Sequence, residues 1–229
     1  MLRNFAIGLG IVAALAVAAN LQAQGPGGPG GRGGMMGGQR GSLLMLLQNE
    51  QVQKEIELVA DQKEKVTALA TETREAMLAK MGDMSNLSQE ERRTKMEGMR
   101  KEIEEETAKT QKKVEGILLP KQLERIKQIQ IQVQGAMALS NAEVVKALAL
   151  TDDQQAKIKT INDDARKAMR DMFSGGGPPS EEDREKMQKS MKETETKLMD
   201  VLTAAQKEKL EKMKGSKFDT SVLRGGPRG

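Results

Sequence analysis

Methionine is the residue type through which this chain could do chemistry. Of 16 Met, nine flank two expected turns at spacings typical of one helix face. Their thioethers could fill the core between two helices, form an adaptable surface for unfolded chains, or capture Cu(I) or Ag(I). These candidate client-binding residues are Met77, Met81, Met84, Met96, Met99, Met169, Met172, Met187 and Met191.

The composition removes most other catalytic and metal-binding chemistry. The chain has no Cys and no His, so it lacks disulfides, thiolate and imidazole ligands, and the commonest nucleophile–base pairs. The acidic pairs Asp152-Asp153 and Asp163-Asp164 lack the ligand density of a hard-metal loop. We therefore expect no enzyme activity, no cofactor and no metal site, with soft-metal capture by Met as the remaining alternative.

Charge and aromatic content argue against a nucleic-acid partner. The 37 Lys and Arg nearly balance the 33 Asp and Glu, and part of the basic excess lies at the two ends of the chain. The three aromatic residues are Phe5, Phe173 and Phe218, too few for a surface on which bases stack.

Four copies of a five-residue pattern, Leu-Thr-x-x-Gln, predict four helix starts. In such a pattern the Thr oxygen accepts from the Gln backbone N–H, while the Gln side chain accepts from the Thr N–H. The Leu lies where it can pack against the first turn. Two copies are complete and two have Val59 or Leu119 in place of Thr. The motif residues are Leu58, Gln62, Leu118, Gln122, Leu150, Thr151, Gln154, Leu202, Thr203 and Gln206.

The ends of the chain differ in composition from the middle. Residues 1–23 have Arg3, an apolar stretch and a plausible cleavage site at Leu21-Gln22-Ala23, which predicts a secretory signal peptide. We expect no stable membrane span after cleavage, with a retained anchor as the alternative. Residues 24–42 predict a Gly-rich flexible linker, and residues 215–229 a flexible basic tail. A periplasmic or secreted location follows.

The middle of the chain predicts an all-α fold of two tandem antiparallel helical hairpins with short flanking helices. Residues 43–136 and 137–214 align as an internal duplication, with Val52 matched to Val144. Ser88 and Ser180 are expected to start the returning helices, and Ser140 to cap a short helix. The stretch 129–134 alternates Ile or Val with Gln as a strand would, but we interpret it as the end of a helix that begins near Pro120.

The signal sequence, the Met-rich amphipathic helices and the Leu-Thr-x-x-Gln motifs together resemble the Spy/CpxP-type periplasmic proteins. The resemblance covers roughly residues 44–214. It implies a cradle of antiparallel helices that holds unfolded or misfolding proteins without ATP, or that damps an envelope-stress sensor. The chain departs from the zinc- and nickel-responsive relatives because it has no His.

Three functions therefore remain as hypotheses. The first is a holding chaperone or stress modulator whose partners are unfolded proteins. The second is a structural scaffold whose apolar stripes are consumed by self-association. The third is a metal-responsive periplasmic regulator. For the motif residues, helix capping and direct client contact also stay open.

Overall fold

The computed structural model describes residues 41–81, 87–172 and 180–223. These residues form α-helices and short 3-10 helices and include no strand, so the expected all-α class is confirmed. The expected signal peptide, all but the last two residues of the expected linker, and Met84 lie outside the described residues, as do the side chains of Met81 and Met96.

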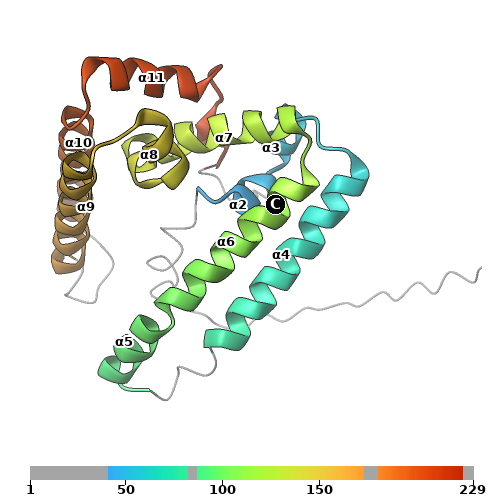
Figure 1. The fold of residues 1–229 in the computed structure, drawn as a ribbon. Helices are drawn as coiled ribbons and strands as arrows, with labels where there is room; N and C mark the ends of the chain where they lie inside the picture. The colour runs from blue at the N-terminus through green and yellow to red at the C-terminus, as the bar shows by residue number, and fades with distance from the viewer. Residues whose placement is uncertain (1–40, 82–86, 173–179, 224–229) are drawn as a thin grey trace, which may run out of the picture.

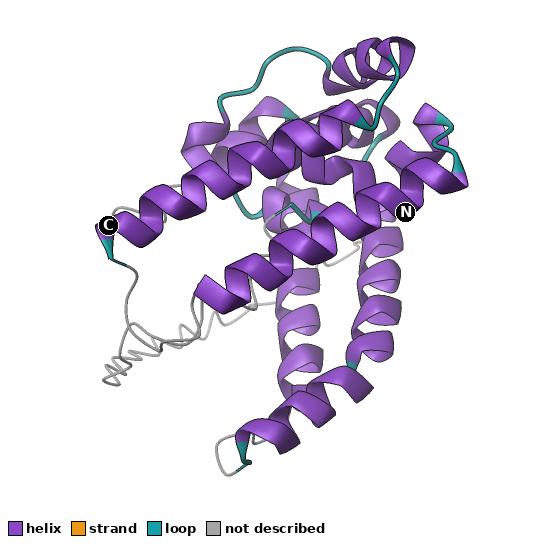
Figure 2. Ribbon diagram, turned by 90° about the vertical axis from the view of Figure 1, so that its left-hand side faces the viewer, coloured by secondary structure: helices purple, strands orange, loops and turns teal. Residues whose placement is uncertain are grey.

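Two pairs of long helices project from a group of shorter ones (Figure 1). Arm 1 is α4 (Ala60–Met81) packed against α6 (Arg100–Ile117), with α5 (Gln89–Gly98) at its far end. Arm 2 is α9 (Asp152–Met172) packed against α10 (Glu181–Asp200). Figure 2, seen from the side, shows that the two arms point in different directions.

The shorter helices form a hub between the arms. They are α2 (Leu43–Leu47), α3 (Glu50–Glu55), α7 (Pro120–Gln134), η1 (Gly135–Ser140), α8 (Ala142–Leu148), α11 (Ala204–Lys214) and η2 (Thr220–Leu223). The helix α2 has four buried Leu and packs against α4, α6 and α7. Five residues are too few for an independent helix, so burial of these Leu is what stabilises α2.

Two clusters of buried apolar side chains hold the hub together. The first contains Leu43, Leu44, Leu46, Leu47, Val52, Ile56, Leu58, Val66, Leu69, Val114, Leu118, Ile126 and Ile129. The second contains Ile131, Ala136, Ala138, Leu139, Val144, Leu148, Leu150, Ile158, Leu198, Leu202 and Leu210. The helix α7 contributes to both clusters, so the expected boundary at residue 136 does not separate two independent cores.

The alternating stretch of α7 is helical, as we interpreted it. At about 100° per residue, alternation on a helix places Ile129 and Ile131 on nearly opposite sides. Ile129 belongs to the first cluster and Ile131 to the second. The intervening Gln face the remaining two sides: Gln130 Nε2 donates to the Gly41 carbonyl at 2.6 Å, and Gln132 Nε2 to the Lys214 carbonyl at 2.6 Å. The alternation of Ile and Gln therefore suits a helix that packs against neighbours on all of its sides.

The expected flexible tail is partly a packed segment, which corrects the boundary at residue 215. Gln132 Oε1 accepts from the Phe218 backbone N–H at 2.8 Å, and Arg125 donates to the Ser216 carbonyl at 2.8 Å. Phe218 and Leu223 pack against the first cluster. The Gly content predicted flexibility, but these two apolar side chains and the α7 donors hold residues 215–223 in place. Residues 224–229 lie outside the described part.

Two helix starts also differ from expectation. The N-cap of α8 is Asn141, whose Oδ1 accepts from the Glu143 N–H at 2.9 Å. Ser140, the expected cap, instead accepts from the Asn162 amide of α9 at 2.9 Å. The returning part of arm 1 is two helices rather than one, because the helix breaks at Met99 after Gly98, a residue that weakens a helix.

The returning part of each arm starts at the expected serine. Ser88 and Ser180 form reciprocal caps with Glu91 and Asp183. Donation by the Ser180 hydroxyl at 2.6 Å and by its backbone N–H at 3.0 Å lowers the pKa of the Asp183 carboxyl. The carboxylate therefore stays ionised at the N-terminus of α10, where the helix dipole favours negative charge.

Lys127 of α7 forms ion pairs with α6 of arm 1 and with α8 of the hub. Its Nζ lies 3.3 Å from Glu115 of α6 and 2.7 Å from Glu143 of α8. Partial burial acts to lower the pKa of Lys127, but the hydrogen bonds and attraction of Glu143 and Glu115 outweigh it and leave this pKa raised. The ammonium group is thus a charged link between the two halves of the chain.

Candidate functional site

The four motif copies all lie at the base of an arm, where a helix begins. The structure has α4, α7, α9 and α11 starting directly after their second motif residue. The four motif Leu are 5–7% exposed and belong to the two apolar clusters. The motif Leu are thus core residues, and their packing on the first turn of the following helix stays a prediction.

The two complete copies form the reciprocal cap that their sequence predicts. Thr151 Oγ1 accepts from the Gln154 N–H at 3.2 Å, and Gln154 Oε1 accepts from the Thr151 N–H at 3.1 Å. Thr203 and Gln206 make the same two bonds, at 3.3 and 3.0 Å. The capping role of Thr151 and Thr203 follows from these contacts.

The two incomplete copies keep only the bond that Gln accepts. The backbone N–H groups of Val59 and Leu119 donate to Gln62 and Gln122 at 3.2 and 2.9 Å. Neither Val nor Leu has a side-chain oxygen, so the second bond of the cap is missing. Their side chains are 59% and 63% exposed, so each leaves an apolar side chain in solvent.

Replacing Leu119 by Thr is expected to stabilise the protein by about 0.5–1 kcal/mol. The residue already has the extended backbone of an N-cap, and a Thr oxygen would accept from the Gln122 N–H. The exposed Leu side chain gives up little buried area. Urea unfolding followed by far-UV circular dichroism measures the change, and an unchanged or lower midpoint would refute the missing-cap interpretation.

Each arm is closed at its base by a pair of Gln side chains that bond to each other, which we name a Gln clasp. In arm 1, Gln62 Nε2 donates to Gln122 Oε1 at 2.8 Å, and Gln122 Nε2 donates back to Gln62 Oε1 at 3.0 Å. Gln62 also donates to the Ile117 carbonyl at 2.8 Å, and Gln122 to the Glu57 carbonyl at 3.2 Å. With the cap bonds, both amide hydrogens and two acceptor positions of each side chain are used.

The clasp of arm 2 repeats this arrangement. Gln154 donates to Gln206 at 2.7 Å and Gln206 donates to Gln154 at 3.0 Å. The second amide hydrogens go to the Val201 and Leu148 carbonyls at 2.9 and 3.3 Å. The arm 1 pair is buried, at 7% and 8% exposed, whereas the arm 2 pair is half-buried.

Sequence reasoning treated the motif Gln as a cap and missed its partner across the arm. One signal was available: Glu caps a helix as well as Gln does, yet all four copies have Gln. A pair that exchanges bonds needs a donor and an acceptor on each side chain, which only the amide supplies. The matched clasps, and positive φ at the matched residues Glu57 (54°) and Ala149 (49°), support the internal duplication, which stays a prediction.

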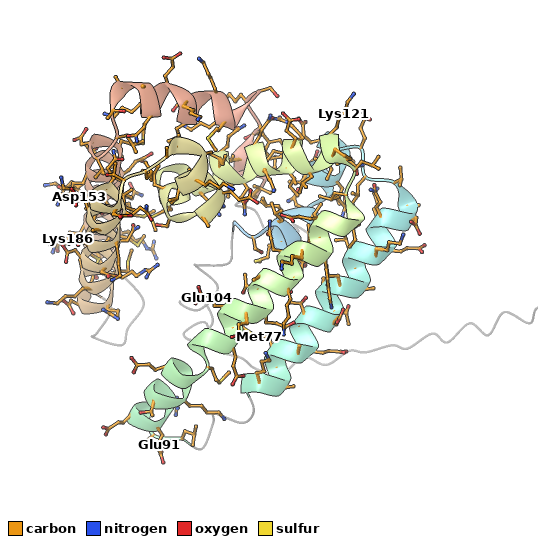
Figure 3. All side chains as sticks on the ribbon, in the orientation of Figure 1. Met77, Glu91, Glu104, Lys121, Asp153 and Lys186 are labelled. Carbon is orange, nitrogen blue, oxygen red and sulfur yellow. The ribbon has the colours of Figure 1, made fainter. Side chains whose placement is uncertain are left out.

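The candidate methionines lie along the arms, and most of those whose side chains the structure describes are half-buried. Met77, Met169, Met172 and Met187 are of intermediate exposure, and Met191 is 58% exposed. Figure 3 shows Met77 on the seam between α4 and α6. Met99 differs, since it is 8% exposed and cannot offer its side chain to a partner without a local opening.

The buried core of the described chain contains almost no methionine. Its apolar members are Leu, Ile, Val and Ala, with Met99 as the exception. In arm 2, no described residue is buried in α9 beyond Asn162 or in α10 before Leu198. A layer of two helices leaves its seam open on both faces, so the outer part of this arm has apolar contacts but no closed core.

The described surface has no enclosed pocket among its best-formed hollows. One is an open, charged face of α10 from Glu185 to Lys197, and the other lies at the start of α5. Among the described residues, no group of three or more Asp or Glu could hold a metal ion. No helix in the described ranges is long and apolar enough to cross a membrane. The two arms and their clasps are therefore the candidate site.

The fold and these arms define a class: an all-α protein with two helical arms on a shared hub. Comparison of the chain with protein-family models, with curated proteins and with solved structures returned no match.

Proposed function

We propose that this protein is a periplasmic or secreted, non-enzymatic binding protein of the Spy/CpxP type that holds unfolded chains without ATP. One observation carries the proposal: apart from Met99, the candidate methionines whose side chains the structure describes are half-buried or exposed rather than core. An apolar side chain that is exposed in the folded protein can contact a partner without any part of the protein having to unfold first.

The chemistry of Met suits an unfolded partner. Its side chain is unbranched and flexible, so it repacks around apolar segments of many sequences. The charged residues that flank each seam keep the arms hydrated between binding events. Because the apolar clusters lie in the hub and at the arm bases, contacts along the outer arms can form and break while the core stays intact.

Replacing Met169, Met172, Met187 and Met191 together by Gln tests the proposal. Each replacement removes about 1 kcal/mol of apolar contact with a bound chain, so holding is expected to weaken at least about tenfold. Light scattering of a slowly aggregating client, at substoichiometric and equal ratios, measures holding. Circular dichroism checks that the variant remains helical.

Met137 supplies a matched control. It lies in η1 of the hub and is 46% exposed, so Met137→Gln makes the same chemical change at similar exposure outside the arms. Holding by Met137→Gln is expected to equal that of the wild type. If the fourfold arm variant also held clients as well as the wild type, the arms would not be the binding surface.

A scaffold function is favoured by a different observation, the exposed Val59 and Leu119 at the base of arm 1. Each is an exposed apolar side chain at the same motif position, and copies of the chain could associate through such side chains. Sedimentation of the wild type against a Val59→Thr/Leu119→Thr variant separates the two functions. Association of the wild type that disappears in this variant, with no client holding by either, would favour the scaffold.

A further inference from the structure

Methionine is the only readily oxidised side chain type in this protein. The chain contains 16 Met and no Cys, Trp, Tyr or His. In most proteins a thiolate reacts with peroxides ahead of other side chains. Here no such group competes, so a two-electron oxidant that meets the protein reacts at a thioether.

The exposure of the described methionines predicts an order of reaction. Oxidation of Met follows access to its sulfur. Met191 is 58% and Met137 46% exposed, and Met169, Met172 and Met187 are half-buried. Met99 is 8% exposed and should react last. Met169, Met172 and Met187 lie within about two helical turns of the turn that joins α9 to α10.

The fold can accept oxygen on these residues without losing its core. A sulfoxide is polar, and inside an apolar cluster it would cost the transfer of a polar group from water. Neither apolar cluster has a methionine among its buried members. The four arm 2 methionines are instead half-buried or exposed, so water can reach an added oxygen.

We propose that Met191, with Met169, Met172 and Met187, forms a site of reversible oxidation by peroxide, and that this oxidation switches off holding by arm 2. The sulfur lone pair attacks one oxygen of hydrogen peroxide, the O–O bond breaks and an S–O bond forms. The displaced hydroxide takes the proton of the transferred OH, so the products are the sulfoxide and water. The sulfur loses two electrons and the peroxide gains them.

The effect on holding rests on the function proposed above, whereas the modification itself does not. A sulfoxide keeps the shape of the side chain but replaces an apolar atom by a strongly hydrated group. The seam of arm 2 therefore loses the apolar surface that an unfolded chain would contact. Methionine sulfoxide reductases supplied with a thiol reductant restore the thioether: two thiols give up two electrons and form a disulfide, and the sulfoxide oxygen leaves as water.

The test treats the full-length mature protein with hydrogen peroxide and follows each Met by peptide mass spectrometry. The oxidation rate of Met191 is expected to exceed that of Met99 by about tenfold or more, with the helical circular dichroism signal unchanged. Client holding is expected to fall as the arm 2 sulfoxides accumulate, and to return after incubation with sulfoxide reductases of both stereospecificities. Equal rates at Met191 and Met99, or loss of helix before oxidation, would overturn the site.

A variant with Leu at all four arm 2 positions assigns the effect. Its holding is expected to fall less under peroxide than that of the wild type, because the four Leu are not oxidised and the remaining candidate methionines lie in arm 1. If peroxide lowered holding by this variant as much as by the wild type, the switch would lie elsewhere and the proposal would fail. Ordered oxidation of a protein that holds no client in either form would instead refute the proposed function and leave the modification site standing.

Discussion

The Gln122→Leu variant is expected to lose about 3 kcal/mol of folding stability. Gln122 is 8% exposed and Leu fills nearly the same volume, so the loss comes from hydrogen bonds rather than from a cavity. The change removes the bonds that Gln122 makes to the Leu119 N–H and the Glu57 carbonyl, and both of its bonds to Gln62. Gln62 keeps its bonds to the Val59 N–H and the Ile117 carbonyl. Every buried polar group left unpaired costs about 1–3 kcal/mol. Urea unfolding followed by far-UV circular dichroism gives the value, since the chain has no Trp or Tyr to report by fluorescence.

A double-mutant cycle with Gln62→Leu shows whether the two amides act as a pair. The double variant is expected to cost less than the sum of the single variants by about 1–2 kcal/mol. Each single variant already breaks both bonds between the two amides, so the second substitution does not break them again. The same cycle with Gln154 and Gln206, whose side chains are half-buried, should show a smaller coupling. Additivity within about 0.5 kcal/mol in arm 1 would mean that no clasp exists.

Replacing Leu47 by Ala is expected to destabilise the protein by about 3–5 kcal/mol. Leu47 is 0% exposed in α2, where it is enclosed by the first apolar cluster. Its loss removes apolar contacts and leaves a cavity that side chains of the surrounding helices α3, α4, α6 and α7 fill only in part. A loss of this size would show that α2 is part of the packed core, and not an extension of the preceding Gly-rich linker that contributes little to stability.

Leu78 is the matched control for this substitution. It lies in the longer helix α4 and is 58% exposed, so Leu78→Ala makes the same chemical change without a cavity. We expect its unfolding free energy to stay within about 0.5 kcal/mol of the wild type. Similar losses for the two variants, or a Leu47→Ala loss below about 1 kcal/mol, would contradict the packing of α2.

The helix starts could be predicted from the sequence because capping is local. Thr151 and Gln154 are three residues apart, and so are Ser180 and Asp183, so both partners of each bond are visible in a short window. The interpretation of residues 129–134 as helix also held, since Pro120 marks a helix start nearby. The prediction of Ser140 as a cap was wrong by one residue, because Asn141 has an equally suitable side chain.

The contacts between distant segments could not be predicted in the same way. The Gln62–Gln122 bond joins residues 60 apart, and the bond from Phe218 to Gln132 spans 86. A residue such as Gln132 is consistent with a solvated helix face, and only its neighbour in space shows that it binds the C-terminal segment. Phe218 likewise lay in a stretch whose Gly content predicted a flexible tail.

By itself the sequence determined the all-α class, the four motif starts and the apolar stripe of each arm, because these depend on residue spacing along one helix. Only the tertiary structure decided which Gln are paired and that α7 is shared by two apolar clusters. It also decided that Met99 is buried, whereas the other arm methionines whose side chains are described are half-buried or exposed. The physical reason is that exposure depends on how many layers cover a stripe. A pattern of apolar residues shows which face of a helix is apolar, but not whether another helix packs against that face and buries it.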